Sequence, residues 1–106
     1  KELTVEQCQE LREKVAASVV KIPGKAPAGT MVKVQAGCIM AMGDPELPCA
    51  SVCVDMIGAA SVEDKSAFCA ATAQALMEVA DIPANRIYQT FHELPDWGLG
   101  DKCVTL

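Results

Sequence analysis

An apolar run with a single charge, from Pro48 to Gly58, most constrains what this chain can fold into. Its sequence is Pro-Cys-Ala-Ser-Val-Cys-Val-Asp-Met-Ile-Gly, and Asp55 is its only charged residue. Runs of this length that are rich in β-branched residues and bounded by turn formers are typical of strands buried on both faces. We therefore expect a central strand here, covered by helices that precede and follow it in the chain.

The segment before this strand is predicted to be an amphipathic helix. Thr4 and Gln7 form a capping-box pattern, which predicts the helix start. The helix is expected to stop near Val20, because Pro23 and the glycine after it cannot continue it. Apolar residues at helical spacing mark its inner face: Cys8, Leu11, Val15 and Val19.

The segment after the central strand is predicted to be a second helix. Ser61 is its expected N-cap, with Asp64 three residues further on. The helix is expected to run to about Ala80, because Pro83 follows shortly afterwards.

Further strands are predicted outside these helices. Met31–Gln35 has alternating apolar and polar residues, with Cys38–Met42 as its bent or edge continuation. Arg86–His92 is expected to be the next strand, and Cys103–Leu106 a short last one. The stretch 94–101 between them is rich in turn formers and is expected to be irregular.

A pattern of helix, Ile-Pro, loop and strand occurs twice, around Pro23 and around Pro83. Two similar units predict an α+β domain over residues 1–106, in which two β-α-β-type repeats share one sheet and both helices cover one face. The first unit lacks an opening strand, since only residues 1–3 precede the helix cap. Unpaired strand edges cost free energy, so we expect upstream residues or a strand from a partner to complete the sheet.

The composition narrows the class of protein and of partner. Hydrophobic residues make up 51% of the 106 residues and aromatic ones only 4%, which predicts an aliphatic core with apolar surface left for a subunit interface. The formal net charge of −5 argues against nucleic acid as a partner. No apolar run is long enough for a membrane span, and no signal peptide opens the chain, so we expect an intracellular protein.

The chain has six cysteines: Cys8, Cys38, Cys49, Cys53, Cys69 and Cys103. In a small secreted protein they would allow 15 disulfide connectivities. A chain this apolar does not need disulfides, so we expect reduced thiols, most of them facing the core, and a reducing compartment. No Cys-x-x-Cys pair occurs and His92 is the only histidine, so neither a metal nor a cofactor is predicted.

Several short motifs occur in a fixed order: Gly24-Lys25, Pro48-Cys49-Ala50, Ile57-Gly58, Arg86-Ile87-Tyr88 and Trp97-Gly98. Together they resemble the macrophage migration inhibitory factor (MIF) family of the tautomerase superfamily. The resemblance extends over nearly the whole chain. It implies two β-α-β units per subunit and a trimer whose sheets surround a central channel.

The resemblance also implies a substrate site for arylpyruvates. The family's base is an N-terminal proline, and Lys25 matches the lysine that holds the substrate carboxylate. Ile57 matches the backbone position at the end of the strand, and Tyr88 the tyrosine that a neighbouring subunit supplies. Thr90 stands where many relatives have asparagine, and Trp97 matches a tryptophan of the pocket wall. Read without the resemblance, Lys25 is typical of a solvated loop cation, Tyr88 of an interface residue and Trp97 of a loop anchor.

Two functions follow from these residues. The chain starts at Lys1 with no counterpart of the proline, so no catalytic residue is predicted. A non-catalytic structural or protein-binding subunit is therefore expected, in a homotrimer or docked on a larger assembly. The alternative is a keto–enol tautomerase for arylpyruvates of the phenylpyruvate or dopachrome type, provided that an upstream strand begins with proline. His92 is expected to be a surface residue rather than a catalytic one.

Overall fold

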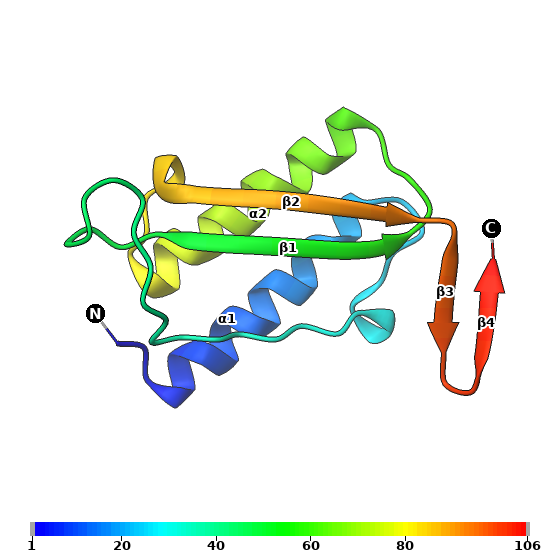
Figure 1. The fold of residues 1–106 in the computed structure, drawn as a ribbon, viewed down its shortest axis with the longest axis horizontal. Coiled ribbons are helices and arrows are strands. Elements are labelled where there is room, and N and C mark those ends of the chain that lie inside the picture. Colours follow the sequence, from blue (N-terminus) through cyan, green and yellow to red (C-terminus); the bar gives the residue numbers. More distant parts are fainter. Residues whose placement is uncertain (1, 106) are drawn as a thin grey trace.

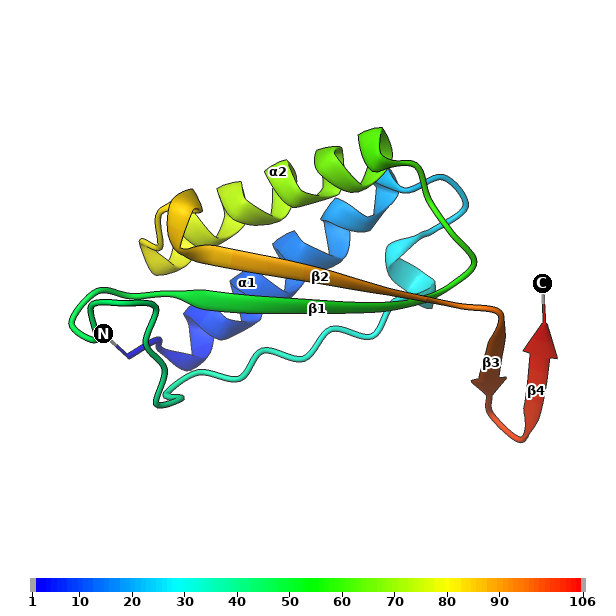
Figure 2. The ribbon, with the colours of Figure 1, turned by 45° about the horizontal axis from the view of Figure 1, so that its top comes forward.

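In the computed structural model, which describes residues 2–105, two helices pack on one side of a pair of strands. The main elements are α1 (Val5–Ser18), β1 (Ala50–Ile57), α2 (Val62–Ala80), β2 (Ile87–Leu94), β3 (Asp96–Leu99) and β4 (Lys102–Thr105). Short 3-10 helices occupy Val19–Lys21, Pro27–Gly29 and Ala84–Arg86. Figures 1 and 2 show both helices on the same face of β1 and β2, and a hairpin of β3 and β4 projecting from one end.

Both helix starts are formed by the side chains that the sequence predicts. The Thr4 hydroxyl accepts a hydrogen bond from the Gln7 backbone N–H at 3.1 Å, and the Gln7 side-chain oxygen accepts from the Thr4 N–H at 2.9 Å. The Ser61 hydroxyl likewise accepts from the Asp64 N–H at 3.0 Å. Asp81 ends α2 in the left-handed conformation, with φ of 59°. The predicted helices are therefore confirmed, including the end of the second at Ala80.

β1 and β2 are parallel and are connected through α2, as expected for a strand–helix–strand unit. The register begins with Ala50 opposite Ile87 and Ser51 opposite Tyr88, and it ends with Ile57 opposite Leu94. The described strands form two separate two-stranded sheets, because β3 pairs only with β4.

The core lies between the helices and the strands. Phe68 of α2 is 2% exposed, and its ring meets that of Phe91 on β2 edge-on, with centroids 5.8 Å apart. Most other buried residues are aliphatic and come from the helices, the turns that follow them and β1: Leu11, Val19, Ile22, Met56, Ala75, Leu76, Val79, Ala80 and Ile82. This packing confirms the expected aliphatic core.

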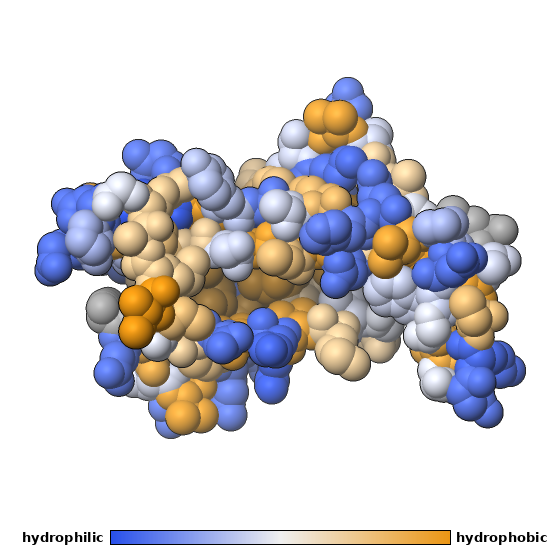
Figure 3. Space-filling view, in the orientation of Figure 1, coloured by the Kyte–Doolittle hydropathy of each residue, from blue (hydrophilic) through white to orange (hydrophobic). Residues whose placement is uncertain are grey.

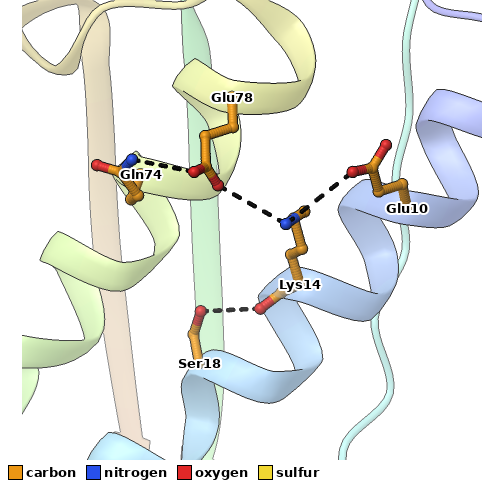
Figure 4. Close-up of polar contacts among 5 residues, drawn as sticks. All are labelled: Glu10, Lys14, Ser18, Gln74 and Glu78. Carbon is orange, nitrogen blue, oxygen red and sulfur yellow. Dashed lines mark hydrogen bonds and ion pairs between the residues drawn. The ribbon is translucent and has the colours of Figure 1, made fainter.

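The ion pair of Lys14 with Glu78 joins the two helices across their outer side, and further polar contacts beside it lie within each helix (Figure 4). The Lys14 ammonium lies 4.0 Å from a Glu10 carboxylate oxygen and 3.7 Å from one of Glu78. The Gln74 side chain donates to Glu78 at 3.2 Å, and the Ser18 hydroxyl donates to the Lys14 carbonyl at 3.0 Å. Such exposed ion pairs contribute little to the free energy of folding, so the buried side chains hold the helices together.

The expectation that the central strand is buried on both faces is wrong. Ser51, Cys53 and Asp55 are exposed, whereas Val52, Val54 and Met56 point toward the helices. Since both helices lie on one side, the small and polar alternate residues of β1 face away from them. We call this side of β1 and β2 the open face.

The prediction of a strand at Met31–Gln35 is also wrong. Val32 and Val34 are half-buried and alternate with exposed residues, as in a strand, but no backbone–backbone hydrogen bond of the described residues involves this segment. Figures 1 and 2 show it extended along α1 and separated from β1. Its predicted continuation, Cys38–Met42, contains only an isolated bridge between Met42 and Asp44. The physical reason is that none of the described strands lies beside this segment to pair with it.

The tail predicted to be irregular contains a strand instead. Asp96–Leu99 pairs antiparallel with Lys102–Thr105, and Gly100 turns the chain with φ of +64°. Glycine at the first central position of a two-residue turn favours a hairpin of this kind. The predicted strand at 103–106 is thereby confirmed up to Thr105, and Leu106 lies outside the described residues.

All six cysteines are free, and none is buried. Cys38, Cys53 and Cys103 are exposed, and the other three are half-buried. The expectation that most face the core is wrong, because aliphatic residues fill that space. Within residues 2–105, no helix is both long and apolar enough to cross a membrane.

Candidate functional site

Lys25 lies against the end of β1. Its ammonium nitrogen donates a hydrogen bond of 2.9 Å to the Ile57 carbonyl oxygen, although the two residues are far apart in sequence. The turn after Pro23 places it there: Gly24 has φ of +84°, and the Lys25 N–H bonds the Ile22 carbonyl at 3.1 Å. Two of the residues that the resemblance selects are therefore in direct contact.

The half-buried Lys25 has donors to spare for a ligand. An ammonium carries three N–H donors, and the structure gives one of them to the Ile57 carbonyl. A fixed cation with free donors is suited to a small carboxylate, since charge-assisted hydrogen bonds are about twice as strong as neutral ones. The arrangement can bind and orient an anion at the carboxyl end of β1.

The neighbouring turn is held by Glu93 of β2. Its carboxylate accepts from the Ala60 N–H at 2.7 Å and lies 3.3 Å from the Lys65 ammonium. The Ala60 hydrogen bond first, and then Lys65, lower the pKa of Glu93 below its ordinary 4.5. Gly58 adds one more backbone hydrogen bond, to Leu94 at 2.9 Å. These contacts fix the end of β1, and with it the carbonyl that Lys25 binds.

We call the contacts of Glu93 with Ala60 and Lys65 the Glu93 clamp. Sequence patterns did not identify it. Glu93 follows the expected strand Arg86–His92, and a single glutamate at a strand end is usually a solvated charge. Its partners are far away in sequence, so only the fold shows the contact.

The other candidate residues lie elsewhere in the chain. Tyr88 is 68% exposed and pairs with Ser51, six positions along β2 from Leu94, which is about 20 Å at the usual rise of a strand. Thr90 lies between them on the open face, and its hydroxyl is 3.5 Å from the Val52 carbonyl. Within one copy, neither side chain reaches Lys25.

Trp97 lies in β3, opposite Val104, and is half-buried. The hairpin leaves the sheet at the end where Ile57 lies (Figure 1). Lys25 and Ile57 therefore form the only pair of predicted site residues that a hydrogen bond joins among residues 2–105.

A second feature of the site is the space between β1 and the extended segment Met31–Gln35, which we call the strand slot. Figure 3 shows hydrophobic residues at the hollow between them. Val15, Val34 and Val52 around it pack on the core but remain only half-buried. In the described part of the chain, β1 pairs with β2 alone, so its other edge faces the slot.

Metal-ligating side chains do not gather anywhere in the described part of the molecule. Within residues 2–105, no group of three or more histidine, cysteine or acidic side chains is placed to hold an ion.

Comparisons with known proteins agree with this geometry. A family model described as "Macrophage migration inhibitory factor (MIF)" matches residues 4–106. Among solved structures, the macrophage migration inhibitory factor of Toxoplasma gondii is 28% identical, with a TM-score of 0.86 over 96% of this chain and 91% of that chain. No curated protein matches the chain.

Two more distant structures have the same fold. The asymmetric trimer of F6 fused 4-OT is 20% identical, with a TM-score of 0.78 over 93% of this chain and 85% of that chain. Pt0534, inactivated by 2-oxo-3-pentynoate, is 21% identical, with a TM-score of 0.74 over 95% of this chain and 86% of that chain. The α+β tautomerase fold is thereby confirmed.

Proposed function

We propose that this chain, which belongs to the macrophage migration inhibitory factor family, is a keto–enol tautomerase for arylpyruvates such as phenylpyruvate. The observation that carries the proposal is the 2.9 Å contact between the Lys25 ammonium and the Ile57 carbonyl. It supports a role for Lys25 in holding the substrate carboxylate, because the cation is already positioned before any ligand binds.

The strand slot offers a position for the catalytic base, which in this family is the amine of an N-terminal proline. The start of α1 lies near the Ala50 end of β1 (Figure 1), so a strand that leads into Leu3 would run antiparallel to β1. Its first residue would then lie at the Ile57 end, beside Lys25. An amine there is kept neutral, and therefore basic, by the neighbouring cation and by the apolar surroundings.

The reaction needs only proton transfer. With the carboxylate on Lys25, the neutral amine of the slot strand removes a proton from the carbon next to the ketone. The amine then returns this proton to the ketone oxygen, so that the keto and enol forms interconvert without a redox change. No cofactor takes part in this scheme.

A homotrimer is part of the proposal. Tyr88 lies about 20 Å from the Leu94 end of its own strand, so a tyrosine can line the site only if another copy supplies it. The exposed large apolar residues support an interface between copies: Met31, Ile39, Met40, Leu47, Tyr88 and Leu99. F6 fused 4-OT, whose fold is similar, is an asymmetric trimer.

The test is steady-state tautomerisation of phenylpyruvate by the full protein and two variants. Lys25→Ala is expected to raise KM about tenfold to a hundredfold, since a charge-assisted hydrogen bond to the substrate is lost. Lys21→Ala, which removes an exposed cation nearby, is the control and is expected to leave KM unchanged. An active trimer whose KM is the same with and without Lys25 would contradict the assignment.

A second candidate is a non-catalytic structural or protein-binding subunit. The strand slot favours it, because the free edge of β1 can pair with a strand of another protein in a larger assembly. Thr90, at the place of the family's asparagine, also fits a site that no longer turns over substrate. A native trimer that leaves phenylpyruvate unchanged would favour this candidate over the enzyme.

We further propose that residues 1–106 form one domain in a reducing compartment. The two groups of core residues both lie between the same helices and strands, which supports cooperative folding. The six free thiols support the compartment. Two separate unfolding transitions in a denaturant titration would contradict the single domain.

A further inference from the structure

The short turn 58–61 connects β1 to α2, and Figure 1 shows it beside the end of β2. Gly58 has φ of +88°, in the left-handed region that favours glycine, so the chain leaves the strand sharply. The Ile57 carbonyl and the Gly58 N–H belong to one planar peptide group. The carbonyl accepts from the Lys25 ammonium at 2.9 Å, and the N–H donates to the Leu94 carbonyl at 2.9 Å. This single peptide group therefore joins Lys25 to the end of β2.

The Glu93 clamp holds the next part of the same turn. One Glu93 carboxylate oxygen accepts from the Ala60 N–H at 2.7 Å, and the other lies 3.3 Å from the Lys65 ammonium. A hydrogen bond to a carboxylate is charge-assisted and is therefore stronger than the neutral bond at Gly58. The turn is thus attached to β2 at two points, by the backbone of Leu94 and by the side chain of Glu93.

The Glu93 clamp also rests on the core. Phe91 lies two positions before Glu93 on β2, so the two side chains share the side of the strand that faces α2. The Phe91 ring meets the buried Phe68 ring edge-on, and the Lys65 ammonium lies 5.7 Å from the Phe91 centroid. The Lys65 and Glu93 side chains are only 23% and 29% exposed, so salt screens their contact less than that of a fully exposed pair. The carboxylate therefore has a fixed position relative to the packed side chains.

We infer that Glu93 is a positioning residue for substrate binding, which acts on Lys25 through the turn 58–61. With the Glu93 clamp in place, the Ile57 carbonyl that binds the Lys25 ammonium is held before a substrate arrives. Without it, the turn gains backbone freedom, and binding of the carboxylate must first order the turn and the cation. Proton transfer by the amine is not touched. The inference rests on the proposed tautomerase function and adds the residue that keeps its carboxylate site in shape.

Steady-state tautomerisation of phenylpyruvate by the full protein tests the inference. Glu93→Ala is expected to raise KM about threefold to tenfold and to leave kcat within about twofold, because only binding of the carboxylate is weakened. Lys65→Met, which frees one oxygen of Glu93 and keeps the Ala60 bond, is expected to raise KM about twofold to threefold. Thr4→Ala, which removes the cap of α1 and leaves the turn intact, is the stability control and is expected to keep the wild-type KM.

Hydrogen exchange of the Ala60 amide, followed by NMR, reports the Glu93 clamp without any substrate. We expect exchange to be about tenfold or more faster in Glu93→Ala than in the wild type, since the amide loses its acceptor. Glu93→Gln keeps an acceptor oxygen for this amide, so we expect it to restore most of the protection and a KM near that of the wild type.

The outcomes separate the inference from the proposed function. If Lys25→Ala raises KM and neither Glu93→Ala nor Lys65→Met does, the inference is overturned and the tautomerase proposal stands. A fall in kcat at unchanged KM in Glu93→Ala would also overturn it, because positioning of Lys25 acts on binding. A native protein that does not turn over phenylpyruvate would overturn the proposed function and the inference together.

Discussion

The two halves of the chain share one sequence pattern and differ in what it forms. Around Pro83, the helix, turn and following residues give α2 and the paired strand β2. Around Pro23, the same order gives α1 and the extended segment Met31–Gln35, which has no backbone–backbone hydrogen bonds among the described residues. The alternation of apolar residues is present in both. The difference teaches that an alternating pattern becomes a strand only where a second strand edge lies beside it.

The largest expected effect tests where the stability lies. Phe68→Ala removes a 2% exposed ring from the packing between α2 and β2, and we expect a loss of about 3–5 kcal/mol in the free energy of unfolding. Val34→Ala, in the unpaired segment, is expected to cost less than about 1.5 kcal/mol, because Val34 is only half-buried. Urea denaturation measures both. Equal losses would show that the first half is packed as firmly as the second.

A smaller effect is expected at the helix caps, where the two halves are alike. Thr4→Ala and Ser61→Ala each remove one side-chain acceptor of a backbone N–H, and each is expected to cost about 1 kcal/mol. Thr4→Ser and Ser61→Thr, which keep the hydroxyl, serve as controls. If only the Ser61 substitution destabilises the protein, the difference between the halves begins in the helices rather than in the strands.

The smallest effect concerns Glu93, which clamps the second half and has no counterpart in the first. Its pKa is lower in the folded protein, owing to the Ala60 hydrogen bond and then Lys65. The stability it contributes is therefore present above the ordinary value of 4.5 and is lost as the pH falls through the lower folded value.

We expect Glu93→Gln to reduce the acid dependence of the midpoint of urea denaturation, with Glu63→Gln, at the exposed start of α2, as control. If the denaturation midpoint of the Glu93→Gln protein fell with decreasing pH as steeply as that of the wild type, the Glu93 clamp would not form in solution.

The sequence was sufficient for the features that depend on local chemistry. The capping residues Thr4 and Ser61 predicted the helix starts, and the apolar run around Asp55 predicted β1. The resemblance selected Lys25 and Ile57, which the structure places in contact. Each of these rests on residues close together in the chain or on motifs in a fixed order.

Contacts between distant segments were beyond the reach of sequence patterns. The pairing of Asp55 with His92, and of Glu93 with Ala60, requires the register of β1 and β2 and the position of α2. The hairpin around Gly100 was missed because its glycines indicated turns more strongly than the short strands beside them. The prediction that β1 is buried on both faces was wrong, because an apolar sequence does not reveal that both helices pack on one side of the strand.

The most direct test of the proposed site is an NMR titration of the full protein with phenylpyruvate, followed through backbone amides and the Lys25 ammonium. We expect the largest shifts at Lys25 and at Gly58, which follows the Ile57 carbonyl, and we expect Lys25→Ala to abolish them. Shifts that persist in Lys25→Ala, or that lie only at the far end of the sheet around Tyr88, would contradict a carboxylate site at the end of β1.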